Sequence, residues 1–310
     1  MRKIIYNQYG TNEVLKLSNV AEPTPTTEEI LVEVKSASIN PVDWKMRSGE
    51  LKMMSGKQFP KGIGCDFAGI VKKTGKDNSE FNIGDNVFGW LPYKEAGTFS
   101  ESIIVSETLT IKKPDNISFE EASCLGMIGG TALIALNDKG GITKNQEILI
   151  NGCTGGVGHL ATQIAKAYGA TVTGICSGKN IDLAKKLGVD SAIDYKKQDV
   201  YQLNKKFDII FDTVGNLAYK KSKKILKRKG KFLNLNPSGL LDILHGLISS
   251  KYKVIMANVK KEHLNELAKL SGAGKIKPII GKSVKLDDAI KVISLLEKGE
   301  NILVKTVIVN

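Results

Sequence analysis

The chain has few cysteines, and their spacing is unlike that of a disulfide framework or a structural zinc lobe. Its 310 residues include four, Cys65, Cys124, Cys153 and Cys176, with no C-x-x-C pair among them. Disulfide-stabilised domains and zinc lobes need closely paired cysteines. We therefore expect four reduced thiols that are mostly buried.

Long apolar runs are absent as well. No stretch approaches the ~18 consecutive apolar residues of a membrane-spanning helix. The opening residues, MRKIIYNQYG, lack the apolar core of a signal peptide. From these two absences we expect a cytoplasmic protein that does not contact a membrane.

Histidine is scarce, and no catalytic constellation of the hydrolytic type is visible. The three histidines, His159, His245 and His263, have no Ser/His/Asp pattern around them, and no pair of carboxylates is spaced for acid–base work. We therefore assign none of the histidines a catalytic role.

Basic residues outnumber acidic ones, with 45 Lys and Arg against 32 Asp and Glu, and the formal net charge is +13. The lysines are spread along the chain except in segment 220–231, KKSKKILKRKGK, which we interpret as the solvated face and end of a helix. No nucleic-acid-binding motif accompanies the charge, so we do not expect nucleic acid as a partner.

Residues 148–170, ILINGCTGGVGHLATQIAKAYGA, carry the strongest local pattern. An apolar run typical of a buried parallel strand is followed by a glycine-rich turn and then by apolar residues at helical spacing. In this context a dinucleotide pyrophosphate binds backbone N–H groups at the helix N-terminus, where a Cβ would be in the way. We predict that Thr154, Gly155, Gly156 and Val157 bind the dinucleotide, although Thr154 replaces the second glycine of G-x-G-x-x-G.

The chain divides into two kinds of segment pattern. In residues 1–117, short β-branched and aromatic segments alternate with Pro, Gly and Asn, which predicts a largely antiparallel β domain. From Ser118, spaced from Glu121 as in a capping box, strands and helices alternate and predict a doubly wound parallel sheet up to residue 274. The tail 275–310 is assigned to the first domain. The predicted fold class is therefore α/β, with a β domain (1–117 and 275–310) and a Rossmann-type domain (118–274).

The alternation predicts particular elements in the second domain. Strands are expected at 147–151, 171–176, 191–194, 207–214, 231–235 and 253–258, and helices up to Tyr168 and at 181–187, 217–228, 240–248 and 262–270. The last strand, 253–258, is apolar and would lie at a sheet edge. Because such an edge invites pairing with a twofold mate, we predict a homodimer.

Several motifs together identify a known family. INPVDWKMRSGE, GCDFAGIVKKTG, NIGDNVFGW, GTFSESIIV, INGCTGGVGHLATQIAKAYGA, KLGVDSAIDY, DTVG and VKTVIV occur in this order. In them the chain resembles the zinc-independent quinone oxidoreductases of the medium-chain dehydrogenase/reductase superfamily over essentially its full length. The resemblance implies a GroES-like β domain plus a Rossmann domain, and it also points to a dimer.

The zinc-dependent alcohol dehydrogenases of the same superfamily are the alternative. Their Cys, His and Cys ligands are matched by Asn40, Cys65 and Met127, of which only Cys65 would bind zinc. The four-cysteine structural lobe is also missing after Val87. Without a Lewis acid an alcohol is poorly activated, whereas a quinone or an enone accepts hydride. We therefore expect no metal site and a small-molecule substrate of the second kind.

The end of the second Rossmann strand favours NADPH over NADH. An NAD-specific site carries a carboxylate there, which binds the ribose 2′-OH. Here the strand is followed by Ser177, Lys179 and Asn180, and a hydroxyl and an ammonium group suit a 2′-phosphate. The resemblance places Tyr195 near the same phosphate, and packing at a strand end is the alternative role of that residue.

Other family positions near the cofactor are matched by residues from separate segments. Thr131 resembles the threonine that faces the nicotinamide, with helix packing as the alternative. Val214, Gly215 and Asn236 follow two strand ends, at the edge of the sheet where ligands bind. Lys305 is implied to approach the cofactor from the returning tail, although a solvated lysine fits equally well.

The substrate cleft is implied by the motif INPVD. Asn40 and Asp43 match positions that line the cleft in the family and are our catalytic candidates, since Asn40 can donate a hydrogen bond to a carbonyl oxygen. Asp43 is also compatible with holding a loop through Asx hydrogen bonds. Trp44 and Tyr93 would either form cleft walls or simply pack.

Two functions of different classes follow from these expectations. The first is an NADPH-dependent oxidoreductase that transfers hydride to a quinone or an α,β-unsaturated carbonyl. The second is a non-catalytic NADPH-binding protein with a structural, sensing or RNA-binding role, in which the basic charge would take part. Turnover of NADPH with simple acceptors distinguishes the two.

Overall fold

The computed structural model describes residues 1–77, 80–237, 239–300 and 304–310. They divide into two units, each with its own β-sheet structure and core. The first unit comprises Met1–Met127, Lys260–Gly272 and Pro278–Asn310, and the second comprises Ile128–Val259 and Ala273–Lys277. The predicted α/β fold class is confirmed, with a largely antiparallel β unit and a second unit built on a parallel sheet of Rossmann type.

The two units differ from the predicted domain ranges at two helices. Helix α3 (Phe119–Ser123) packs against β3 (Glu29–Ser38) and β5 (Asp66–Thr74), and helix α9 (Lys261–Gly272) packs against β8 (Thr110–Lys112). Both helices therefore lie with the first unit, because their apolar faces are buried against its strands. The capping box expected at the start of α3 is present, since Glu121 N–H donates to Ser118 Oγ at 3.2 Å and Ser118 N–H donates to Glu121 Oε2 at 2.9 Å.

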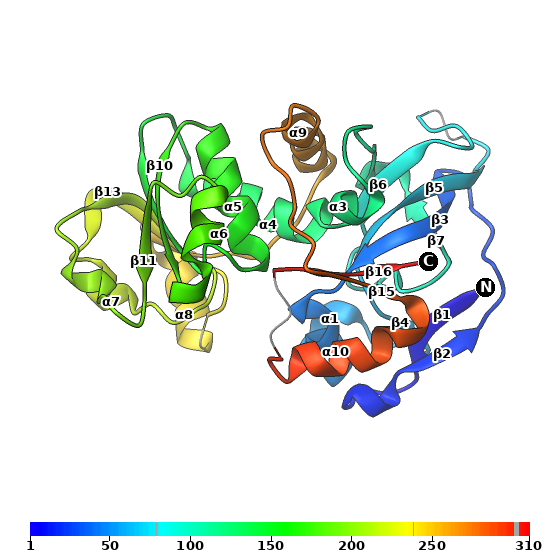
Figure 1. Ribbon diagram of the computed structural model, residues 1–310. Coiled ribbons are helices and arrows are strands. Elements are labelled where there is room, and N and C mark those ends of the chain that lie inside the picture. Colours follow the sequence, from blue (N-terminus) through cyan, green and yellow to red (C-terminus); the bar gives the residue numbers. More distant parts are fainter. Residues whose placement is uncertain (78–79, 238, 301–303) are drawn as a thin grey trace. The chain divides into compact units, whose positions relative to one another are not determined.

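The first unit is built on two sheets (Figure 1). A three-stranded antiparallel sheet has the order β2-β1-β4, and a larger sheet has the order β15-β16-β3-β5-β6-β8, with β7 also paired to β3. Apolar side chains between the sheets and helix α10 form its core. The elements not yet given are β1 (Arg2–Tyr6), β2 (Lys16–Asn19), β4 (Lys61–Gly62), β6 (Asn86–Trp90), β7 (Ser102–Ser106), β15 (Lys282–Lys285), β16 (Thr306–Val309), α1 (Pro41–Ser48), α2 (Lys52–Ser55) and α10 (Ala289–Glu297).

Helix α1 was not expected in a segment interpreted as strands and loops. It begins after Asn40 with Pro41 at its first position, where the missing N–H of proline costs nothing. Asp43 Oδ2 accepts a hydrogen bond from Asn40 N–H at 2.7 Å, and Gly49 ends the helix with φ 91°. Local capping interactions at both ends therefore favour a helix at Pro41–Ser48.

The second unit is a six-stranded parallel sheet with the order β11-β10-β9-β12-β13-β14. Its strands are β9 (Glu147–Asn151), β10 (Thr171–Cys176), β11 (Ser191–Asp194), β12 (Phe207–Asp212), β13 (Leu226–Asn234) and β14 (Tyr252–Val254), and its helices are α4 (Gly130–Leu133), α5 (Gly156–Ala167), α6 (Ile181–Lys186), α7 (Tyr219–Ser222) and α8 (Leu240–Ile248). The chain leaves β9 toward β10 on one side, and β12 lies on the other side. The strand order thus reverses beside β9, which is where doubly wound sheets bind ligands.

The expected helix 217–228 is wrong beyond its first turns. Helix α7 ends at Ser222, and β13 already begins at Leu226, opposite Phe207 of β12. The register of this pair shifts before Ile209, so the strand starts earlier than its apolar pattern suggests. The lysines of segment 220–231 therefore project in part from a strand, and Lys227 Nζ forms an ion pair with Asp208 at 2.7 Å.

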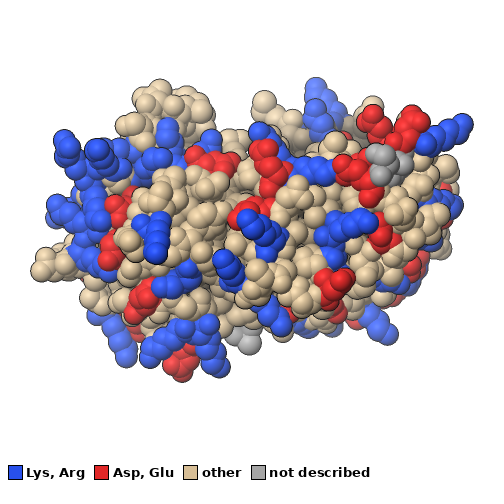
Figure 2. All heavy atoms as spheres, turned by 90° about the horizontal axis from the view of Figure 1, so that it is seen from above, with Lys and Arg blue, Asp and Glu red and all other residues tan. Residues whose placement is uncertain are grey.

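Two surface properties of the described residues bear on partners. None of the helices they form is long and apolar enough to cross a membrane. On the face drawn in Figure 2, Lys and Arg side chains are spread over the surface with Asp and Glu between them.

The predicted dimer-forming segment 253–258 is a strand only up to Val254, at one edge of the parallel sheet, and the homodimer stays a prediction.

Candidate functional site

The glycine-rich turn of the second unit connects the central strand β9 to helix α5. Gly152 has φ 76°, and Gly155 N–H donates to Gly152 O at 2.8 Å, which closes the turn. Gly152 and Cys153 also donate backbone hydrogen bonds to Ile175 O of β10, at 3.0 and 3.1 Å. The first N–H groups of α5 have no acceptor within the helix, so the turn presents backbone donors at the positive end of a helix.

Two glycines of this turn are needed for different reasons. A Cβ added to Gly158 would lie 1.9 Å from Gly152 O, so the fold itself excludes a side chain there. A Cβ added to Gly156 would meet nothing within 4 Å. Packing therefore gives no reason for glycine at position 156, while an anionic ligand at the helix N-terminus does, because a side chain would fill its space. The turn fits the pyrophosphate of a dinucleotide.

Asp212, at the end of β12, organises the neighbouring loop and was missed as a site residue. Its Oδ1 accepts from Asn151 Nδ2 at 2.7 Å, from Val214 N–H at 3.1 Å and from Gly215 N–H at 2.8 Å, and its Oδ2 accepts from Leu217 N–H at 2.7 Å. The carboxylate thus fixes the carboxyl ends of two adjacent strands. An acid that ends the buried apolar run FDIIFD was the available signal.

The structure brings three of the predicted residues together beside this loop. Gly215 has φ 88°, and a Cβ on it would lie 2.4 Å from Asn236 O. Asn236 Nδ2 donates to Thr213 O at 2.9 Å, which ties the loop after β13 to the loop after β12. Val214 stays half exposed at the same edge, at 49%. These residues therefore form one surface at the carboxyl ends of the strands.

On the other side of the turn, further predicted cofactor-binding residues follow the ends of β9, β10 and β11. Asn180 Nδ2 donates to Thr154 Oγ1 at 3.3 Å, so Asn180 positions the turn. Lys179 is exposed, Ser177 is half-buried, and Tyr195 is 58% exposed. One carboxylate was not anticipated here: a Cβ on Gly178 would lie 2.5 Å from Asp194 Oδ2, so this acid also lies at the strand end.

Thr131 and Lys305 lie in buried surroundings. Thr131 is part of helix α4 and is 5% exposed. Lys305 belongs to the first unit, and its Nζ donates to Ile39 O and to Asn40 Oδ1, both at 2.5 Å. Burial lowers the pKa of Lys305, and the nearby thiol and carboxyl groups oppose that effect. The alternative of a solvated lysine is therefore wrong, while cofactor contacts of either residue stay predictions.

Asn40 is held in a buried hydrogen-bond network of the first unit. Its Nδ2 donates to Asp66 Oδ2 at 2.9 Å and to Ser38 Oγ at 3.2 Å, and its Oδ1 accepts from Lys305. Asp66 also accepts from Ser38 Oγ at 2.5 Å and from Met127 N–H at 2.6 Å. Burial raises the pKa of Asp66 to about 6, against the favourable effect of Lys305 and these donors. Asp66 was not predicted, although it follows Cys65 in a matching motif.

Asp43 lies next to this network and is fully buried. Its Oδ2 accepts the hydrogen bond from Asn40 N–H, and its Oδ1 has no hydrogen-bond partner among the described residues. Burial raises the pKa of Asp43 to about 8, with a contribution from the charge of Asp66. A carboxyl group in this environment is protonated at neutral pH. Asp43 thus holds the start of a helix rather than an irregular loop.

The two aromatic candidates differ in their surroundings. Trp44 is half-buried and packs against the apolar core of the first unit. Tyr93 follows β6, contacts the Trp90 ring edge-on at a centroid distance of 6.2 Å, and lines a pocket. Tyr93 therefore lies at a hollowed surface, while a cleft role of Trp44 stays a prediction.

The residues at the family's zinc positions do not fit that metal. Asn40 and Met127 offer an amide and a thioether, and burial raises the pKa of the Cys65 thiol well above its ordinary value, so that the thiolate is disfavoured. Within the described ranges no group of three His, Cys, Asp or Glu side chains could hold a metal ion. We derive no chemical step through zinc.

The chain matches two family models. Residues 26–115 match the alcohol dehydrogenase GroES-like domain, and residues 187–302 match the zinc-binding dehydrogenase model. With the glycine turn at the switch point of a parallel sheet, these matches define an oxidoreductase of the medium-chain dehydrogenase/reductase superfamily with a nicotinamide cofactor.

Relatives give a narrower assignment. The chain is 34% identical to the chloroplastic quinone-oxidoreductase QR1 of Triphysaria versicolor, over 93% of this chain and 92% of that protein. It is 34% identical to 2-methylene-furan-3-one reductase of Solanum lycopersicum, over 96% of this chain and 76% of that one. The structure of Escherichia coli quinone oxidoreductase complexed with NADPH is similar with a TM-score of 0.85 at 26% identity, over 100% of both chains. The chain belongs to the quinone oxidoreductase family.

Replacing Gly156 with valine tests the glycine turn as the cofactor cradle. We expect NADPH affinity to fall by about tenfold or more, because the new side chain occupies the ligand's space. The melting temperature should change by less than about 4 °C, equivalent to ~1 kcal/mol for a chain of this size. Fluorescence titration and thermal unfolding on one preparation measure both. Gly158→Ala is the matched control and should lower the melting temperature. A Gly156→Val protein that binds NADPH like the parent would exclude the cradle.

Replacing Asp43 with asparagine tests its unusual protonation. Unfolded Asp43 loses its proton near its ordinary pKa of 3.8, whereas in the fold it keeps the proton up to about 8. Between these values the folded state binds more protons, so this group lowers stability as pH rises, by up to ~1.4 kcal/mol per pH unit. Asp43→Asn retains an acceptor for Asn40 N–H, and its melting temperature should fall less between pH 5 and pH 8. The exposed Asp115→Asn is the control, and identical pH profiles for all three proteins would contradict the assignment.

Proposed function

We propose that the protein is a zinc-independent, NADPH-dependent oxidoreductase that reduces a quinone or an α,β-unsaturated carbonyl compound. The observation that supports it most directly is the open space at Gly156, which the fold does not require and which a pyrophosphate would use. Family membership supplies the reaction class, and the donor set at Asn40, Cys65 and Met127 argues against metal activation of an alcohol. A cytoplasmic location stays part of this proposal.

The cofactor would be held by the carboxyl edge of the parallel sheet. The N-terminus of α5 would bind the pyrophosphate, and the loops carrying Val214, Gly215 and Asn236, fixed by Asp212, would flank it. A bound nicotinamide supplies the hydride, and Thr131 is the candidate residue against its ring. Ser177 and Lys179 favour a 2′-phosphate, while the carboxylate of Asp194 at the same strand end is the feature that opposes it.

The acceptor would bind at the first unit, near Asn40, Asp43 and Tyr93. The side-chain amide of Asn40 is fully engaged, since its nitrogen donates to Asp66 and Ser38 and its oxygen accepts from Lys305, so its contribution would be to hold the wall of the site in one geometry. Quinones and enones need little activation, because reduction places negative charge on a carbonyl oxygen that can be protonated from water. The name of the tomato relative describes an exocyclic methylene conjugated to a ketone, which is such an acceptor.

A turnover screen tests the proposal. Purified protein should oxidise NADPH in the presence of simple quinones or enones and remain inactive toward saturated aldehydes. A chelator should leave the rate unchanged, because no residue set for zinc is involved. Tight NADPH binding with no turnover on any acceptor would instead favour the non-catalytic cofactor-binding protein. Loss of activity on chelation would contradict zinc independence.

Substituting Lys179 tests cofactor preference. Lys179→Ala should weaken NADPH binding by roughly 1–3 kcal/mol, the value of a charge-assisted hydrogen bond, and leave NADH binding nearly unchanged. Lys186→Ala, which removes another exposed lysine of the same unit, is the matched control. Calorimetric titration with both cofactors measures the difference. Equal losses for NADPH and NADH, or a parent protein that prefers NADH, would show that Asp194 and not Lys179 governs the ribose site.

A further inference from the structure

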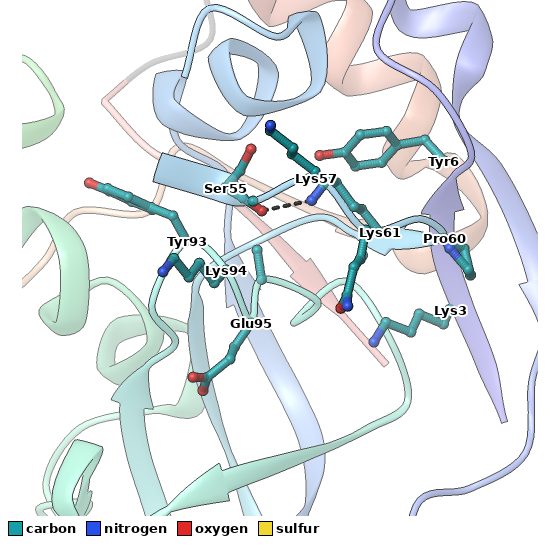
Figure 3. A pocket seen from close by; sticks show the side chains of 13 residues that line it. Lys3, Tyr6, Ser55, Lys57, Pro60, Lys61, Tyr93, Lys94 and Glu95 are labelled. Atoms are coloured by element: carbon teal, nitrogen blue, oxygen red, sulfur yellow. Dashed lines mark hydrogen bonds between the residues drawn. The ribbon is translucent and has the colours of Figure 1, made fainter. Parts of the chain in front are cut away.

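The first unit contains a pocket with a volume of about 520 Å³ that no part of the proposed function uses, apart from Tyr93 at its rim. Strand β1, the segment after α2 and the segment after β6 contribute its walls (Figure 3). It is lined by Lys3, Tyr6, Ser55, Gly56, Lys57, Gln58, Pro60, Lys61, Gly62, Tyr93, Lys94, Glu95 and Ala96. Four lysines against one glutamate give this lining an excess of positive charge.

The positive charge of the lining is not neutralised by the protein. Among the described residues, no carboxylate forms an ion pair with Lys3, Lys57, Lys61 or Lys94. Figure 3 shows the carboxylate of Glu95 well apart from the ammonium group of Lys3. Positive charges that line one hollow repel one another, and an anion bound there would relieve that repulsion.

Lys3 is held in place without a partner for its charge. A Cβ on Gly62 would lie 2.8 Å from Lys3 Cε, and a Cβ on Gly97 would lie 2.6 Å from Lys3 Nζ. The side chain thus runs between two glycines that leave room for it. Burial lowers the pKa of Lys3, and within the described part of the chain its Nζ donates no hydrogen bond. Ordering a half-buried ammonium group costs free energy that a bound anion would offset.

Lys61 and two tyrosines supply oriented donors beside it. Lys61 Nζ donates to Ser55 O at 2.6 Å and lies 5.2 Å from the centre of the Phe59 ring, which fixes its position and leaves further N–H groups free. Burial raises the pKa of both Tyr6 and Tyr93, so their hydroxyl groups remain proton donors. Neither hydroxyl has a hydrogen-bond partner among the described residues.

We propose that this pocket binds the phosphate group of a small organic phosphate monoester. Separate ammonium groups suit a tetrahedral dianion that accepts hydrogen bonds in several directions, whereas a planar carboxylate is better matched by an arginine fork, and the pocket contains no arginine. Its volume exceeds that of a phosphate ion, and the half-buried ring of Tyr93 offers apolar surface for the organic part.

Phenyl phosphate is a suitable probe, titrated calorimetrically into the protein with excess NADPH present so that the cofactor's own phosphate sites are occupied. Lys3→Gln should lower its affinity by about tenfold or more. The exposed Lys57→Gln should lower it as well, without risk to the fold, and Lys16→Gln on β2 should leave it unchanged. Benzoate, which carries one planar charge, should bind more weakly than phenyl phosphate to the parent.

Three results would overturn the proposal: no binding of phenyl phosphate to the parent, Lys3→Gln and Lys57→Gln proteins that bind phenyl phosphate as tightly as the parent does, or benzoate bound to the parent as tightly as phenyl phosphate. Melting temperatures of the variants, measured on the same samples, separate a lost ligand contact from a lost fold. The titration requires no turnover, so its outcome is independent of the proposed reaction.

Discussion

The arrangement of the first unit depends on one buried carboxylate, that of Asp66. It accepts hydrogen bonds from Ser38 at the end of β3, from Asn40 before α1 and from the backbone of Met127. The stretch at residues 38–40, Asp66 itself and Met127 are thereby joined at a single point. Removing an acid from water is costly, and the donors together with Lys305 offset that cost only when all of them are in place. Of the positions matched to zinc ligands, Asn40 contributes its side chain and Met127 its backbone N–H to this hydrogen-bond network.

The second unit also contains a buried carboxylate that fixes neighbouring segments, at the edge of the sheet proposed to bind the ligand. Asp212 accepts from one side chain and three backbone N–H groups, and so fixes loops that would otherwise be mobile. Asp66 begins a strand and Asp212 ends one, and each accepts hydrogen bonds from both side-chain and backbone donors. In both units a buried acid therefore fixes the backbone near a candidate site.

The strand, glycine turn and helix at 148–170 could be predicted from sequence because each signal is local. Which glycine serves the fold and which serves the ligand could not, since the answer depends on Gly152 O lying against position 158 and on empty space at position 156. Helix α1 had a readable signal in Asn40, Pro41 and Asp43. The early start of β13 had none, because Leu226 is drawn into the sheet by pairing with Phe207, and tertiary pairing overrides local propensity.

The central strand β3 has a consequence for the order in which the protein can fold during synthesis. Its residues Ser36–Ser38 pair with β16, which the ribosome makes more than two hundred residues later. Lys305, which donates a hydrogen bond to Asn40, is made at the same late stage. The strands of the second unit all come from one continuous stretch and can complete their sheet first. Until β16 is made, the end of β3 at Ser36–Ser38 lacks that partner strand, and unpaired strand edges of this kind are bound by chaperones and promote aggregation.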